Sequence, residues 1–167
     1  STNLNDINNL MAQVTESLVQ STSTADSSPG REAVALQLEA IRATINDLVN
    51  AKDYQGQGVF DDTNSNTVPV GPGLSVEAVG TRQALTNNVI GTRSLDQILA
   101  DAIASVRTGT PADRETALGD ARKALDHVIV AQSLQGVRTQ RLEDIENRLA
   151  DNALALTERR SQLEDTD

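Results

Sequence analysis

The chain has 167 residues, 24 acidic and 14 basic, and a formal net charge of −10 at pH 7. Such an acidic protein repels a phosphate backbone, so we expect no nucleic-acid partner. It has no cysteine and no tryptophan, with one tyrosine and one phenylalanine, which excludes disulfides and requires an aliphatic core. No apolar run approaches the ~20 residues of a membrane helix, so we expect no membrane partner. Aliphatic cores of this kind suit long helices that pack side by side.

Two segments near the N-terminus have the apolar spacing of amphipathic helices. In the first, apolar residues recur three or four positions apart, at Leu4, Ile7, Met11, Val14 and Leu18. The second, roughly residues 31–52, repeats the spacing at Val34, Leu38, Ile41, Ile45 and Leu48. A polar stretch containing Pro29 separates them and should end the first helix. The pattern predicts an antiparallel pair of helices.

Between residues 56 and 92 the pattern changes from helical to extended. Valines stand at positions 68, 70, 76 and 79, on both sides of the turn sequence Gly71-Pro72-Gly73. Two short strands around such a turn form a small hairpin. We therefore expect a small β-rich insert at 56–92, between the two parts of a helical rod at 1–55 and 93–167.

Helical spacing returns after the insert and continues to the end of the chain. One helix is indicated by Leu95, Leu99, Ala102 and Val106. Thr110-Pro111 then resembles a helix start, with threonine as the cap and proline in the first helical position. The remainder has no further proline, and an unbroken helix there would be about 80 Å long. Its leucines repeat every seven residues, at Leu142, Leu149, Leu156 and Leu163.

Three consecutive apolar residues, Val128, Ile129 and Val130, indicate that the long helix has several neighbours at this level. We therefore expect the bundle to be thickest near residues 118–131. Together, the segments predict a mainly α protein, an elongated antiparallel helical bundle or coiled-coil rod with a small β-hairpin insert.

The glycine-rich and acidic stretches do not complete a nucleotide or calcium site. Gly56-x-Gly58 lacks both a third glycine and the Gly-Lys-Ser/Thr ending of a phosphate loop. The segment that starts at Asp62 resembles a calcium loop, but Thr67 and Gly73 stand where glycine and glutamate are required. We expect a turn and a solvated loop instead.

The ionisable residues do not indicate an enzyme either. His127 is the only histidine, without a nearby cysteine or second histidine, and we expect it at the surface or its boundary. Glu164, Asp165 and Asp167 crowd the end of the chain, where we expect a frayed acidic terminus and not a paired-carboxylate active site. We therefore predict no catalytic residue, no cofactor and no metal.

Two blocks at opposite ends of the chain resemble bacterial flagellins. Residues 4–21, "LNDINNLMAQVTESLVQS", resemble the flagellin N-terminal helix pattern LNEINNNLQRVRELAVQS without a gap. The second block matches the C-terminal helix pattern, in which LGAxQNRFE is followed by SRIEDAD. The matching positions are Gly136, Arg141, Leu142, Glu143, Asn147, Leu149 and the segment "SQLEDTD". Together the blocks cover about a third of the chain, and their order is that of the flagellin superfamily.

The segment "DYQGQGVFDD", residues 53–62, distinguishes two branches of this superfamily. It is similar to the DGxGxYLFAG pattern of the hook–filament junction family, and it keeps Asp53, both glycines and Phe60. It departs at Asp61-Asp62, where that family has small residues. Filament flagellins have TQFNGVxLL here and remain the alternative. The segment carries Tyr54 and Phe60, which we expect to seal the apolar end of the rod.

The resemblance implies a structural protein of the bacterial flagellum. A junction protein is exported, assembles outside the cell as a ring of subunits and joins hook to filament. Its implied partners are other copies of itself, flagellin, the hook-side junction protein and an export chaperone. The resemblance also implies that the terminal polymerisation segments are absent from this sequence, so that the fragment is a monomer.

The polar break in the long helix is our candidate subunit contact, because amides and arginine accept both water and a protein partner. Its residues are Gln132, Gln135, Gly136 and Arg138. The alternative is a bundle end that faces solvent. A function of another class also remains open: a helical adaptor or chaperone that binds partner helices through an exposed seam.

Overall fold

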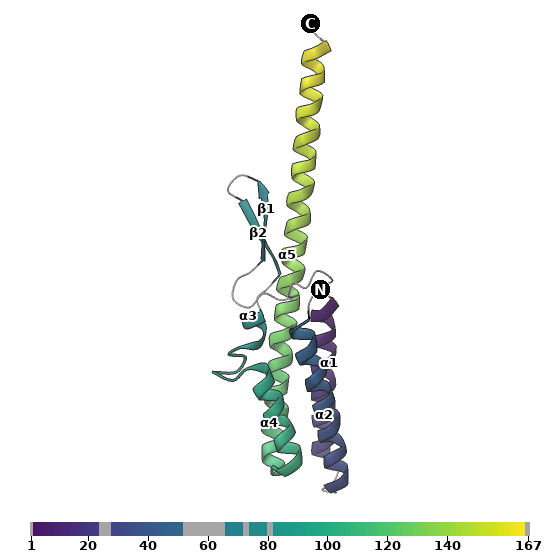
Figure 1. The fold of residues 1–167 in the computed structure, drawn as a ribbon, viewed down its shortest axis with the longest axis vertical. Coiled ribbons are helices and arrows are strands. Elements are labelled where there is room, and N and C mark those ends of the chain that lie inside the picture. The colour runs from purple at the N-terminus through teal and green to yellow at the C-terminus, as the bar shows by residue number, and fades with distance from the viewer. Residues whose placement is uncertain (1, 24–27, 52–65, 72–73, 80–81, 166–167) are drawn as a thin grey trace.

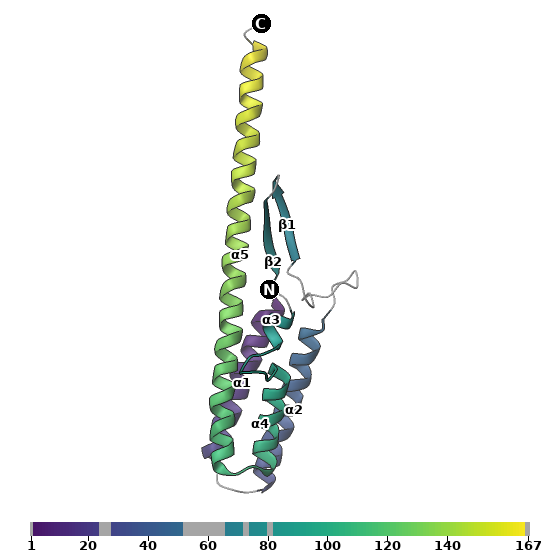
Figure 2. The same cartoon turned by 90° about the vertical axis from the view of Figure 1, so that its left-hand side faces the viewer.

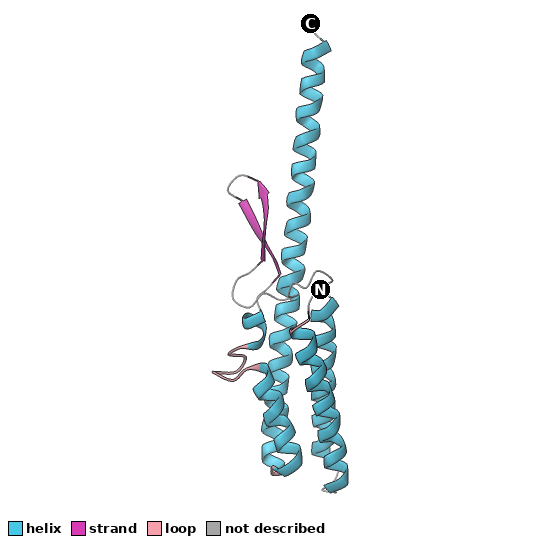
Figure 3. Cartoon of the chain, viewed as in Figure 1, coloured by secondary structure: helices cyan, strands magenta, loops and turns pink. Residues whose placement is uncertain are grey.

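The computed structural model describes residues 2–23, 28–51, 66–71, 74–79 and 82–165. The described elements are α1 (Thr2–Ser23), α2 (Ser28–Val49), β1 (Asn66–Gly71), β2 (Leu74–Val79), α3 (Arg82–Thr86), α4 (Leu95–Thr108) and α5 (Pro111–Asp165). Figure 1 shows α1, α2, α4 and the first part of α5 side by side, with the rest of α5 projecting beyond them. Helices dominate the fold (Figure 3), and the predicted mainly helical, elongated bundle is confirmed.

The first two helices form the predicted antiparallel pair, but α2 begins earlier than its apolar spacing indicated. It starts at Ser28, so Pro29 lies in the first turn instead of outside the helix. A proline is tolerated there because the backbone N–H groups of the first turn have no partner within the helix. Pro29 therefore belongs to the start of α2.

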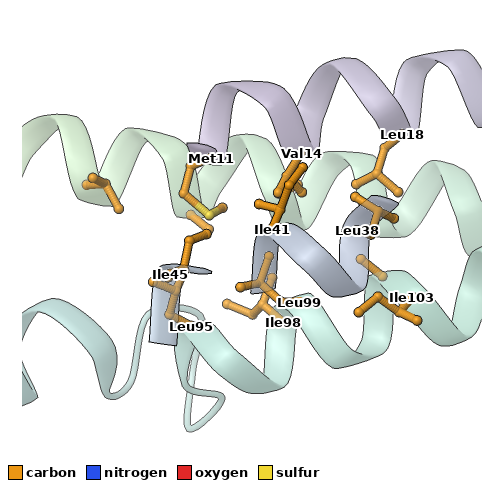
Figure 4. Close-up of a cluster of buried hydrophobic side chains, with 14 of the residues drawn as sticks. Met11, Val14, Leu18, Leu38, Ile41, Ile45, Leu95, Ile98, Leu99 and Ile103 are labelled. Carbon is orange, nitrogen blue, oxygen red and sulfur yellow. The ribbon is translucent and has the colours of Figure 1, made fainter. Parts of the chain in front are cut away.

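The core is aliphatic and lies where α1, α2 and α4 meet α5. The predicted apolar stripe of α1 is fully buried, and Figure 4 shows Met11, Val14 and Leu18 turned toward side chains of α2 and α4. In α2 the stripe drifts from a strict heptad. Ala35 and Val49 are buried, whereas the predicted Val34 and Leu48 are only partly buried. The mismatch between 3.6 residues per turn and a strict heptad accounts for the shift from Leu48 to Val49 at the C-terminal end of α2.

The start of α5 is built as the sequence predicts. The Thr110 hydroxyl accepts a hydrogen bond from the Asp113 N–H at 3.2 Å, and the Asp113 carboxylate accepts one from the Thr110 N–H at 2.9 Å. This reciprocal capping begins a helix of 55 residues. The bond from the Thr110 N–H lowers the pKa of Asp113. Small buried residues, among them Ala117 and Ala121, let the neighbouring helices approach α5 closely.

The three consecutive apolar residues of α5 do not share one environment. Val128 is fully buried, but Ile129 and Val130 are 41% and 58% exposed. The interpretation that neighbours surround the helix here was wrong. Each residue turns the helix by about 100°, and the neighbouring helices cover only the side that carries Val128.

Between α2 and α4 the chain forms β1, β2 and α3. The strands pair antiparallel, with Asn66 opposite Val79 and Val68 opposite Val76, and they lie beside α5 (Figure 2). The segment predicted as β-rich also contains the short helix α3, which is followed by turns at residues 87–92. The Arg82 guanidinium donates a hydrogen bond to the Asn50 side chain, which ties the start of α3 to the end of α2. Residues 52–65, with Tyr54 and Phe60, lie outside the described residues.

A half-buried ion pair joins α2 to α4. Arg42 donates two hydrogen bonds to the Asp96 carboxylate, at 2.7 and 2.8 Å, and the Asn46 amide donates a third at 3.0 Å. The bonds from Arg42 lower the pKa of Asp96 and raise that of Arg42. Asp96 also lies in the first turn of α4, where a negative charge is favourable.

Two further arginines join the helices of the bundle. Arg93, in the turn before α4, pairs with Asp101 of α4 at 3.1 Å and with Asp120 of α5 at 2.8 Å. Arg107 of α4 pairs with Glu39 of α2, and its hydrogen bond lowers the pKa of Glu39. Together with the Arg42–Asp96 pair, these ion pairs link α2, α4 and α5 beside the apolar core.

Candidate functional site

The candidate site is the part of α5 that leaves the bundle. No described residue of α5 after Val128 is fully buried. From position 139 to 165 every residue is exposed except Leu142 and Ile145, which are half-buried. The helix continues without further proline and with local polar support, including a 3.2 Å ion pair between Arg160 and Glu164. Most of the surface of α5 beyond residue 138 is therefore exposed to solvent.

This surface carries an apolar seam at heptad spacing. Leu149, Leu156 and Leu163 continue the line of the half-buried Leu142 and are 45%, 65% and 71% exposed. A seam of this kind is the surface that a second helix covers in a coiled coil. It is narrow, because Asn152 and Arg159 occupy positions between the leucines where coiled coils usually have apolar residues.

The four residues of the candidate subunit contact divide into two groups. Gln132 is already used within the chain: its amide accepts a hydrogen bond from Asn8 at 2.7 Å and donates one to Asn5. It therefore joins α1 to α5. Gln135 and Arg138 are half-buried, and each also has an interaction partner.

Gly136 differs from the other three. It is exposed, and apart from its own stretch of helix backbone no atom lies within 4 Å of the position that a Cβ would occupy. Nothing in the described part of the chain therefore requires glycine there, although glycine in a helix interior costs about 1 kcal/mol relative to alanine. Whether the four residues contact another subunit remains a prediction.

Exposed aliphatic side chains on the outer side of α5 were missed as a functional feature. Val130, Leu134 and Val137 are 58%, 49% and 66% exposed. Their spacing of four and three residues places them on one face of the helix. The spacing itself is visible in the sequence. That this face points away from the bundle follows only from the arrangement of the neighbouring helices.

His127 has a structural contact. Its Nε2 lies 3.0 Å from the carbonyl oxygens of Ala84 and Leu85, so Nε2 carries the proton and donates to the end of α3. The ring is half-buried and holds α3 against α5. Among the residues that the structure describes, no group of three His, Cys, Asp or Glu side chains could hold a metal ion.

Shallow hollows lie between the helices in the described part of the chain, and two of them have polar linings. One of about 380 Å³, between α4 and α5, is lined by Arg93 and by the two carboxylates with which it pairs, Asp101 and Asp120. The other, of about 290 Å³, is lined by Arg82 and Asn50, which are also hydrogen-bonded together. These charged and amide groups are thus engaged in contacts between elements of the chain. Across the described helices, no stretch is long and apolar enough to cross a membrane.

Comparison with known proteins finds likeness in structure and not in sequence. No protein-family model matches the chain, and no curated protein matches it with significance. A structure from Vibrio parahaemolyticus, assigned as a flagellar hook-associated protein, superposes with a TM-score of 0.81 at 18% identity. The match covers 92% of this chain and 78% of that one.

Two FlgL crystal structures match almost as well. FlgL of Xanthomonas campestris gives a TM-score of 0.78 at 16% identity, over 96% of this chain and 91% of that chain. FlgL of Bacillus cereus gives 0.74 at 16% identity, over 93% and 83%. The chain therefore has the fold of flagellar hook-associated proteins. More particularly, it has the fold of FlgL, the hook–filament junction protein. The predicted resemblance to the junction family is thus confirmed at the level of the fold.

Proposed function

We propose that this protein is a structural component of the bacterial flagellum that joins the hook to the filament as one subunit of an assembled ring. The observation that carries the proposal is the likeness of fold to FlgL over nearly the whole chain, together with the flagellin-like blocks at its two ends. The role is mechanical and needs no catalysis. The protein acts outside the cell, after export.

The partners we propose are other copies of the chain, flagellin, the hook-side junction protein and an export chaperone. The exposed seam of α5 at Leu149, Leu156 and Leu163 supports this role, since it offers a helix-binding surface that the bundle leaves open. The division into a rod at 1–55 and 93–167 and an insert at 56–92 also belongs to the proposal. In it, the rod makes the lateral contacts and the insert lies on the outside.

A strain that lacks the protein tests the role. If the protein is a junction subunit, electron microscopy should show hooks without filaments, and flagellin should accumulate in the medium. Intact hooks with shortened filaments would instead identify the protein as a filament flagellin. Normal flagella, or loss of another protein from the cell surface, would favour the helical adaptor or chaperone and contradict both.

The part played by the seam is tested by restoring this strain with variants of the full gene product. Leu156→Lys places a positive charge in the seam. Thr157→Lys places the same charge on the adjacent position outside the seam and serves as the control. The hydroxyl of Thr157 is exposed and donates to the Ala153 carbonyl of its own helix. We expect Thr157→Lys to restore filaments and Leu156→Lys to fail, although both proteins are secreted. If both variants restore filaments equally, the seam has no part in the proposed assembly.

A further inference from the structure

A second surface on α5, separate from the leucine seam, runs along the side of the helix that faces away from the bundle. Seven exposed residues spaced three or four positions apart form it, and we call it the outer stripe. In chain order they are Lys123, Asp126, Val130, Leu134, Val137, Arg141 and Asp144. Two residues turn a helix by about 200°, so Val130 lies opposite the fully buried Val128.

The outer stripe has an apolar centre and charged ends. Val130, Leu134 and Val137 are each about half exposed or more, at 58%, 49% and 66%. Valine at a solvent-facing position of a helix lowers helix propensity and gains nothing from burial. Covering this centre with another surface would remove its apolar side chains from water and stabilise it. Figure 2 shows α5 along one side of the molecule, with β1 and β2 on its other side.

The charges indicate what that other surface is. Along the chain the stripe reads positive, negative, three aliphatic residues, positive, negative. When a second copy is laid against it in the antiparallel direction, Lys123 lies opposite Asp144 and Asp126 lies opposite Arg141. A parallel copy would place each charge against its own equivalent. The stripe is thus complementary to itself in one direction only.

We propose that the outer stripe binds the outer stripe of a second copy of this chain, antiparallel, about a two-fold axis beside Leu134. In this arrangement Val130 packs against Val137 of the other copy, Leu134 packs against its own equivalent, and every ion pair occurs twice. Contacts of this type, in which one patch meets itself, are the usual ones in dimers. Each bundle lies on the far side of its own α5, so the two bundles do not collide.

The contact is weak and belongs to the unassembled protein. Three aliphatic side chains and four exposed charges per copy bury far less than the ~800 Å² per partner of stable complexes. Exposed ion pairs add little each, and salt weakens them. We expect a dissociation constant on the order of 0.1–1 mM, with monomers at micromolar concentration. Neighbours in a ring all point the same way and cannot make this contact, so the inference stands independently of the proposed function.

Charge exchange tests the pairing. Sedimentation equilibrium between about 10 µM and 1 mM should show association that Lys123→Glu or Asp144→Lys each weakens about tenfold, because two attractive pairs become repulsive. The double variant should restore the association to within about twofold. Glu143→Lys, the same change of charge on an adjacent exposed position off the stripe, should have no such effect.

Cross-linking tests the direction, since the chain has no cysteine of its own. Leu134→Cys should form disulfide dimers readily. Val130→Cys should cross-link with Val137→Cys in a mixture faster than either variant does alone, whereas Ser161→Cys should remain monomeric. Preferential Val130–Val130 cross-links, absence of rescue in the charge-exchange double variant, or no association at about 1 mM would each overturn the proposal. Unchanged circular dichroism excludes misfolding, because all these positions are exposed.

Discussion

Leu18 and Leu156 have the same side chain in opposite environments, so truncation of each to alanine isolates the effect of burial. Leu18 of α1 is 0% exposed in the core, and Leu156 is 65% exposed on the projecting part of α5. Leu18→Ala removes three carbons, worth about 2.4 kcal/mol at ~0.8 kcal/mol each. The cavity that remains adds to this, and we expect a total loss of about 3 kcal/mol.

Leu156→Ala should change the free energy of unfolding by less than about 0.5 kcal/mol, because water already covers the side chain and alanine is a better helix former. Urea denaturation followed by far-ultraviolet circular dichroism measures both variants, since the chain has no tryptophan to report by fluorescence. In thermal unfolding, Leu18→Ala should lower the midpoint by about 6–12 °C. Equal losses for the two variants would refute the distinction between a packed bundle and a free projection.

Three further predictions concern polar and backbone positions. Asp96→Asn should lower the free energy of unfolding by about 1 kcal/mol at pH 7, because the half-exposed carboxylate accepts two hydrogen bonds from Arg42. Since Arg42 lowers the Asp96 pKa, this stability is present above the unfolded pKa of about 3.9 and is lost as pH falls through the lower folded value. Unfolding curves of the two proteins should therefore converge in acid, and a constant difference down to about pH 2 would contradict the pairing. Gly136→Ala should stabilise the chain by about 0.5–1 kcal/mol in urea denaturation, because nothing apart from its own stretch of helix backbone lies within 4 Å of the new Cβ. A loss of stability there would mean that the space is occupied. The Ser94 hydroxyl accepts a hydrogen bond from the Gln97 N–H at 3.1 Å and caps α4. Ser94→Ala should lower the free energy of unfolding by about 1 kcal/mol and speed hydrogen exchange at the Gln97 amide. Ser94→Asp should retain the cap and serve as the control.

The parts of the fold that the sequence predicts are those fixed by local rules. The apolar stripe of α1 and the Thr110-Pro111 start of α5 depend on residues a few positions apart, and both are confirmed. The wrong interpretation of Ile129 and Val130 has a different origin. Periodicity shows which residues share a helix face, but not which faces the neighbouring helices cover.

The same limit applies to the candidate site. The spacing of Leu149 and Leu156 predicts the seam of α5, but its exposure depends on where the bundle ends. Gln132 shows the limit most clearly, because its partners Asn8 and Asn5 lie 124 and 127 positions away along the chain. An amide that looks free in the sequence is thus committed to an internal contact by the packing of α1 on α5.

The contacts at the root of the insert have a consequence for how this protein can vary. Arg82 is tied to Asn50, and His127 holds the end of α3 on α5. The two points where the chain leaves and re-enters the bundle are therefore joined by contacts that do not involve residues 52–81. The entropy of closing a loop rises only slowly with its length. A longer or shorter segment can therefore stand there while the contacts of Arg82 with Asn50 and of His127 with α3 are kept.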